Sequence, residues 1–153
     1  MADELPSMTV KAIGIVRNKV EERSRAGRDW WADLVSEIEI DNRLTEALDG
    51  LEEFSHIIVL YWMNQLNEDR VSLKIHPRGQ LELPLVGLFV TRTPNRPNPI
   101  GKATVRLLER RGNILKVKGL DAIDGTPVID IKPYLPGYDS APDAQVPQWL
   151  PNL

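Results

Sequence analysis

The stretch TRTPNRPNPIG, at residues 91–101, concentrates side chains that could recognise a ligand. Its three prolines fix φ and remove backbone N–H donors, which stiffens the chain and leaves hydrogen bonding to the side chains. Those side chains are the guanidiniums of Arg92 and Arg96 and the amides of Asn95 and Asn98. A rigid loop with such groups suits recognition of a polar, planar ligand or a phosphate. On physical grounds alone, a stiff crossover whose asparagines cap turns is an equally good interpretation.

A second polar stretch, DGTPVIDIKPYLP at residues 124–136, combines a carboxylate, an ammonium and a phenol. Asp130 and Lys132 are two residues apart, so they share one face of the strand expected there. Tyr134 follows as an aromatic ring with a polar tip. The two charges either form a structural ion pair or hold a ligand at the lip of a barrel.

Short strands are predicted to position both stretches. Alternating or continuous apolar patterns predict strands over residues 10–16, 36–40, 56–63, 71–75, 85–90, 103–108, 114–120 and 127–131. One short amphipathic helix is expected over residues 44–51, with Asn42 as its N-cap. Many strands without a βαβ alternation predict an all-β (mainly β), single-domain β-barrel with long loops. Since no G-x-G occurs, the glycine loop of a doubly wound nucleotide-binding sheet is not expected.

Composition narrows the classes of function. The 153 residues include no cysteine and two histidines, so neither disulfides nor a metal site are expected. No apolar stretch approaches the roughly 20 residues that span a bilayer, and the acidic N-terminus is unlike a signal peptide. A cytoplasmic location without membrane contact is therefore expected. Residues 74–118 carry ten basic and two acidic side chains, and residues 29–73 carry two basic and eleven acidic ones. This asymmetry predicts a basic face that attracts phosphate.

Five motifs, taken together, resemble one family. They are IG at residues 13–14, GLEEFSHIIVLYWMN at 50–64, HPRG at 76–79, VGLFVTRTPNRPNPIG at 86–101 and GLDAIDGTPVIDIKPYLP at 119–136. In this order they are similar to the TsaA/TrmO family of tRNA methyltransferases across nearly the whole chain. The resemblance implies a TsaA-like β-barrel over residues 1–153, S-adenosylmethionine as cofactor, and a homodimer. It also implies N6-methylation of N6-threonylcarbamoyladenosine next to the anticodon of tRNA. Because the chain shows little periodicity after Pro136, residues 137–153 are expected to form a tail that wraps the surface.

The resemblance further implies which residues form the site. The cofactor-binding set is Asn64, Gln65, Arg92, Arg96, Asn98, Thr104, Asp130, Ile131, Lys132 and Pro133. Arg92 would bind the cofactor's carboxylate and Asp130 its ammonium, while Asp130 and Tyr134 are the candidates for the catalytic base. The family commonly has a histidine at the position of Asn64, and its longer members have a C-terminal domain after the segment YLPGYDS.

A tRNA substrate would meet basic and aromatic side chains. The candidate phosphate contacts are Arg23, Arg25, Arg28, Lys74, Arg78, Lys102, Arg106, Arg110 and Arg111. Trp30 or Trp31 could stack on an unstacked base, although a solvated charge or a core aromatic is the alternative for each. Two other functions stay open: methylation of a small amide or amine metabolite, and a non-catalytic module that binds S-adenosylmethionine.

Overall fold

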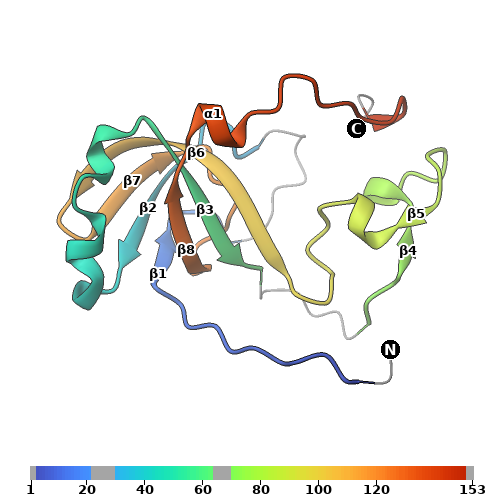
Figure 1. The fold of residues 1–153 in the computed structure, drawn as a ribbon, viewed down its shortest axis with the longest axis horizontal. Helices are drawn as coiled ribbons and strands as arrows, with labels where there is room; N and C mark the ends of the chain where they lie inside the picture. The colour runs from blue at the N-terminus through green and yellow to red at the C-terminus, as the bar shows by residue number, and fades with distance from the viewer. Residues whose placement is uncertain (1–2, 22–29, 64–69, 151–153) are drawn as a thin grey trace.

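A computed structural model describes residues 3–21, 30–63 and 70–150. Six antiparallel strands close into a barrel in the order β1-β2-β7-β6-β3-β8 (Figure 1). They are β1 (Gly14–Arg17), β2 (Val35–Ile40), β3 (His56–Trp62), β6 (Ile100–Arg111), β7 (Ile114–Lys118) and β8 (Pro127–Pro133). The prediction of a mainly-β barrel is confirmed.

The segment between β2 and β3 is helical, but it is not the α-helix expected over residues 44–51. It forms two 3-10 helices, η1 (Asn42–Leu48) and η2 (Leu51–Glu53). The N-cap of η1 is Asp41, whose carboxylate accepts a backbone N–H of the first turn, and not Asn42. Gly50 separates the two helices with a φ of 90°, a left-handed conformation that glycine adopts without the strain of a Cβ atom.

Residues 70–90 leave the barrel as an excursion (Figure 1). The strands predicted at 71–75 and 85–90 shrink to β4 (Lys74–Ile75) and β5 (Val86–Gly87), which pair only with each other. Two 3-10 turns, η3 (Pro77–Gly79) and η4 (Leu88–Val90), complete the excursion. Most of its large apolar side chains are exposed in the described structure, so the apolar run over 85–90 does not mark a buried strand.

The C-terminal part contains one short α-helix, α1 (Pro136–Asp139), and the predicted tail is exposed over residues 137–148. Among the described helices, none has the length and apolarity needed to cross a membrane.

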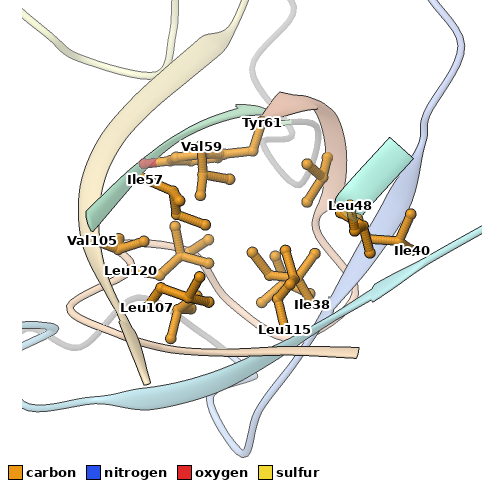
Figure 2. Close-up of a cluster of buried hydrophobic side chains, with 14 residues drawn as sticks. Ile38, Ile40, Leu48, Ile57, Val59, Tyr61, Val105, Leu107, Leu115 and Leu120 are labelled. Carbon is orange, nitrogen blue, oxygen red and sulfur yellow. The ribbon is translucent and has the colours of Figure 1, made fainter. Parts of the chain in front are cut away.

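Alternation along the strands fills the barrel with apolar side chains. Ile57, Val59 and Tyr61 of β3 point inward and join Ile38 of β2 and Leu115 of β7 in one cluster (Figure 2). Each is at most 4% exposed. Full burial of an aliphatic side chain of this size contributes about 1.5–3 kcal/mol. The inward-facing set therefore fixes which residues of β3 and β6 face the interior and which face out.

Candidate functional site

A cleft of about 890 Å³ opens where β6 extends beyond its neighbour β7. β7 ends at Lys118, and Gly119 turns the chain away with a φ of 94°, a conformation that favours glycine. Residues 100–105 of β6 consequently pair with β3 alone within the described chain. The cleft is lined by Trp31, Tyr61, Met63, Arg78, Phe89, Thr91, Arg92, Arg96, Pro97, Asn98, Ile100, Gly101, Lys102, Ala103, Thr104, Gly119 and Asp121. Its volume lies within the roughly 300–1,000 Å³ of small-molecule sites.

Main-chain hydrogen bonds show which residues of β6 face β3. The Met63 N–H donates to the Pro99 carbonyl at 2.7 Å, and the Leu107 N–H donates to the Ser55 carbonyl at 2.8 Å. Hydrogen-bonded and non-hydrogen-bonded pairs alternate along an antiparallel ladder. The odd-numbered residues of β6 from 101 to 107 therefore direct their N–H and C=O groups toward β3.

The even-numbered residues of β6 direct theirs to the opposite side. At Arg106 that side is occupied by β7, where Arg106 pairs with Lys118. At Lys102 and Thr104 that side is the cleft, which both residues line. An unpaired strand edge is a row of donors and acceptors ready to bind another group. The cleft thus offers alternating main-chain donors and acceptors, which suit the edge of a planar heterocycle.

Tyr61 and Gly101 form the inner wall of the cleft. The Tyr61 hydroxyl donates to the Asp121 backbone carbonyl at 2.8 Å, which fixes the ring. The ring packs directly on Gly101, where an added Cβ atom would lie no farther than 2.9 Å from three of its carbons. Trp31 and Met63 add half-buried apolar surface to this wall. The absence of a side chain at Gly101 therefore leaves the space that the Tyr61 ring occupies.

Cationic side chains dominate the polar lining of the cleft. Arg78, Arg92, Arg96 and Lys102 all contribute to it, whereas Asp121 is the single acidic residue among the lining residues that the structure describes. Clefts lined by one sign of charge concentrate ligands of the opposite sign. The arrangement favours a ligand with a carboxylate or phosphate group.

Arg78 reaches the cleft from a strained loop. Its φ of 54° and ψ of 23° are left-handed, and it is the one non-glycine residue with positive φ among the described residues. The His76 Nδ1 atom lies 2.9 Å from the Leu83 carbonyl and closes the loop around it. Such a conformation costs about 1–3 kcal/mol and is typical of binding sites, where surrounding structure holds it.

Four residues of the predicted cofactor-binding set come together in the cleft. They are Arg92, Arg96, Asn98 and Thr104. The first three belong to the proline-rich loop that the sequence singled out, and Thr104 lies on the unpaired edge of β6. The ligand-recognition interpretation of that loop is consistent with this position.

The predicted residues on β8 lie apart from this cleft. Leu60 of β3 pairs with Lys102 on one side and Asp130 on the other, so β3 separates Asp130 from the lining strand. The Asp130 carboxylate lies 2.9 Å from the Lys132 ammonium, and this hydrogen bond and charge raise the pKa of Lys132. Asp130 also accepts the N–H of Ile131 at 2.9 Å. The structural ion pair that the sequence left open is present, and the ligand-binding roles stay predictions.

The remaining predicted residues divide into placed and unplaced ones. Pro133 ends β8, and the ring of Tyr134 packs edge-on against His56 with centroids 6.4 Å apart, so neither lines the cleft. Asn64 and Gln65 lie outside the described residues, although they follow the cleft-lining Met63 in the sequence. The predicted phosphate contacts Arg23, Arg25 and Arg28 also lie outside the described residues. Over residues 3–21, 30–63 and 70–150, no group of three or more His, Asp or Glu side chains could hold a metal ion.

The sequence did not predict several residues that line the cleft, among them Tyr61, Phe89, Gly101 and Asp121. Tyr61 lies in the continuous run HIIVLYWM, which carries no alternation to show which face is inward. Phe89 lies in the strand predicted over residues 85–90, and no sequence pattern marks Asp121 or Gly101 as lining residues. A tyrosine inside an apolar run, which needs a partner for its hydroxyl, was the available signal for an internal polar contact.

The tRNA-methyltransferase O N-terminal domain family matches residues 21–140. The chain belongs to the TrmO family. A crystal structure of TrmO from Pseudomonas aeruginosa superposes with a TM-score of 0.74 at 32% identity, over 92% of this chain and 62% of that one. A second TrmO crystal structure gives a TM-score of 0.75 at 32% identity, over 92% and 64%.

Relatives of this TrmO-family chain differ in length. An S-adenosyl-L-methionine-binding protein of Archaeoglobus fulgidus is 45% identical over 86% of this chain and 93% of its own length. Another protein of that organism is 44% identical over 90% of this chain, which spans 37% of it. The tRNA (adenine(37)-N6)-methyltransferase of Mus musculus is 40% identical over 70% of this chain and 25% of its own length. This chain therefore corresponds to only part of the longer relatives.

Proposed function

We propose that this domain binds S-adenosylmethionine in the cleft and serves N6-methylation of threonylcarbamoyladenosine at position 37 of tRNA. Membership of the TrmO family supports the reaction class, and the mouse relative is named for methylation of adenine 37. The observation that carries the proposal is the cleft itself, which joins an unpaired main-chain edge, a cationic rim and an aromatic wall.

The lining residues fit the parts of this cofactor. S-adenosylmethionine, when bound, supplies a methyl group on a positively charged sulfonium. Arg92 binds the carboxylate by charge-assisted hydrogen bonds, and Asp121 accepts hydrogen bonds from the ammonium. The main chain of Lys102 and Thr104 pairs with the edge of the adenine. The Tyr61 ring, fixed through its hydroxyl, lines the inner wall of the cleft.

We retain Asp130 and Tyr134 as candidates for the catalytic base, with a homodimer as the arrangement that would bring them to a cleft. Both lie beyond β3 from the cleft of their own protomer, so a partner's cleft is the one they would serve. Asp130→Asn tests this role. If the variant keeps both cofactor affinity and turnover, the assignment is wrong, and the ion pair with Lys132 is structural.

The main-chain contact is tested by Thr104→Pro. Proline removes an N–H that faces the cleft but takes no hydrogen bond from the ladder with β3, and strand edges tolerate proline. The expected result is a retained fold and a cofactor affinity about 2- to 10-fold weaker, since one hydrogen bond contributes about 0.5–1.5 kcal/mol. Calorimetric titration with S-adenosylmethionine measures it.

Two matched variants separate the main chain from the side chain. Thr104→Val keeps the N–H and should bind the cofactor as the wild type does. Ala103→Pro removes an N–H that points to β3 and should unfold the barrel. Equal cofactor affinity in Thr104→Pro and wild type would exclude the Thr104 N–H as a cofactor contact.

The reaction itself is tested by nucleoside mass spectrometry of threonylcarbamoylated tRNA incubated with the protein and S-adenosylmethionine. A methyl gain on the modified adenosine is the expected result. If the cofactor binds but tRNA gains no methyl group, the tRNA assignment fails, and methylation of a small amide or amine metabolite becomes the interpretation to test.

A second candidate function is a module that binds S-adenosylmethionine without turnover. The observation that favours it is the Archaeoglobus fulgidus relative of nearly equal extent, which is named only for binding. Such a module would bind the cofactor and leave it intact in the presence of any acceptor. Release of S-adenosylhomocysteine with an acceptor would exclude it.

A further inference from the structure

Phe89 is an exposed aromatic residue at the cleft. It is 78% exposed, although it contributes to the cleft lining. Of the large exposed apolar residues, only Phe89 and Ile100 line the cleft within the described chain. Tyr61, by contrast, is 4% exposed and belongs to the inner wall. The rings of Tyr61 and Phe89 would therefore contact different parts of a bound ligand. Tyr61 lies inside the barrel, and Phe89 lies at the solvent side of the cleft.

Hydrogen bonds fix the backbone turn that carries Phe89. It sits in the middle of η4, whose first residue Leu88 is buried. The Leu88 N–H donates to the Leu73 carbonyl at 2.9 Å, and the Leu88 carbonyl accepts from both the N–H and the hydroxyl of Thr91. The turn is thus fixed at both ends, so the exposure of Phe89 is built into the fold.

Arg96 covers one side of this ring. Its guanidinium lies 5.7 Å from the ring centroid, within the range of a cation–π contact. The guanidinium is itself held by the carbonyls of Thr91 at 3.0 Å and Thr93 at 3.4 Å. Phe89 and Arg96 form a preorganised aromatic and cationic pair, which loses little conformational freedom when a ligand stacks on it.

Unstacked nucleobases are recognised by such pairs. Single-stranded nucleic acid binds where bases stack on aromatic rings and phosphates meet arginine or lysine. Arg78 and Arg92, both exposed, line the same cleft and supply the cations. We propose that Phe89, backed by Arg96, is the platform on which the methyl-accepting base of the polynucleotide stacks. This inference rests on the proposed function and adds the acceptor subsite to it.

The competing occupant of Phe89 is a second copy of the chain. The excursion also exposes Leu73, Leu81 and Leu85 at 77%, 78% and 54%, and these residues do not line the cleft. A protein interface over the excursion would use those leucines together with Phe89. The position of Phe89 at the cleft, next to a fixed guanidinium, favours the base.

The test compares Phe89→Ala, Phe89→Leu and Phe89→Trp in the full chain. Affinity for threonylcarbamoylated tRNA is measured by fluorescence anisotropy with S-adenosylhomocysteine bound, so that no reaction occurs. Loss of one base stack weakens binding about 5- to 150-fold. We expect this loss for the alanine and leucine variants, because both lack an aromatic ring. Leucine keeps the apolar character, so its loss of affinity would show that the π-face is what matters. Tryptophan keeps a π-face and should bind with near wild-type affinity. Since Phe89 is exposed, all three variants should fold, which thermal unfolding verifies.

Three results would overturn the proposal. One is equal tRNA affinity in all variants. Another is a weaker affinity of Phe89→Ala for S-adenosylmethionine, which would assign the ring to the cofactor. The third is a change in the assembly state of the variants, measured by analytical ultracentrifugation, together with tRNA affinity that is restored at higher protein concentration. That result would assign Phe89 to an interface between two copies of the chain. If the wild type binds tRNA with this pattern but transfers no methyl group, the proposed reaction fails while the stacking platform stands. If the wild type does not bind tRNA, both fail.

Discussion

Gly101→Ala should destabilise the barrel and damage the cleft through one clash. The added Cβ atom would lie no farther than 2.9 Å from three carbons of the Tyr61 ring. Carbon atoms in contact prefer about 3.5–4.0 Å, so the ring must shift by about 1 Å. A shift of this size stretches the 2.8 Å hydrogen bond between the Tyr61 hydroxyl and the Asp121 carbonyl beyond its useful range.

The expected cost follows from these contacts. Overpacking of a buried site costs about 1–3 kcal/mol, and a lost hydrogen bond about 0.5–1.5 kcal/mol. Replacing glycine by alanine in a strand returns about 0.5–1 kcal/mol. The net destabilisation is about 2 kcal/mol, which lowers Tm by about 4–8 °C in a domain of this size. Because the ring forms the inner wall of the cleft, affinity for S-adenosylmethionine should fall as well.

Urea unfolding of a double-mutant cycle measures the clash directly. In a Tyr61→Val background the ring is gone, so Gly101→Ala should cost nothing further, and the two changes should couple by about 2 kcal/mol. Gly87→Ala is the matched control, because nothing lies within 4 Å of its Cβ position and its φ is −63°. If Gly101→Ala is as stable as Gly87→Ala, or costs the same with and without the ring, the steric reasoning is refuted.

Two further predictions concern other parts of the chain. Arg78→Asn should raise Tm slightly, because asparagine accepts the left-handed conformation better than arginine, while tRNA binding weakens and its salt slope falls by about one; an unchanged slope would remove Arg78 from the phosphate contacts. The hydrogen bonds and charge of Arg43 lower the pKa of Asp41 from 3.8 to about 2. The stability that Asp41 contributes is therefore present above pH 3.8 and lost as the pH falls toward 2. Asp41→Asn, which retains N-capping ability, should flatten this dependence in urea titrations over that range, and an unchanged slope would contradict the assignment.

The sequence predicted the barrel because its signals are local. Alternation and β-branched runs mark β2, β6, β7 and β8 directly, and turn residues mark their ends. The excursion differs from the prediction because the apolar run over 85–90 has the composition of a buried strand, whereas composition does not show whether another layer covers the run. The helix expected over residues 44–51 is interrupted because Gly50, at a φ of 90°, separates η1 from η2.

The part of the site that the sequence predicted is also the part that depends on local sequence. Arg92, Arg96 and Asn98 form one rigid loop, so their proximity was a local property of the sequence. Asp121 and Trp31 come from distant segments and meet β6 only once the barrel closes. The separation of Asp130 from the cleft depends on strand order, because β3 lies between β6 and β8. Long-range pairing of this kind has no signature in a single sequence.

The cleft exists because neighbouring strands differ in length. β6 runs for 12 residues and β7 for 5, so within the part of the chain that the structure describes the first half of β6 pairs only with β3. An exposed strand edge invites aggregation unless something covers it. Here the edge lies within a cationic cleft, which attracts an anionic ligand. A bound cofactor would complete the hydrogen bonding that β7 leaves open, and cofactor binding should therefore protect the amides of Lys102 and Thr104 from hydrogen exchange more than those of the already paired Gly101 and Ala103.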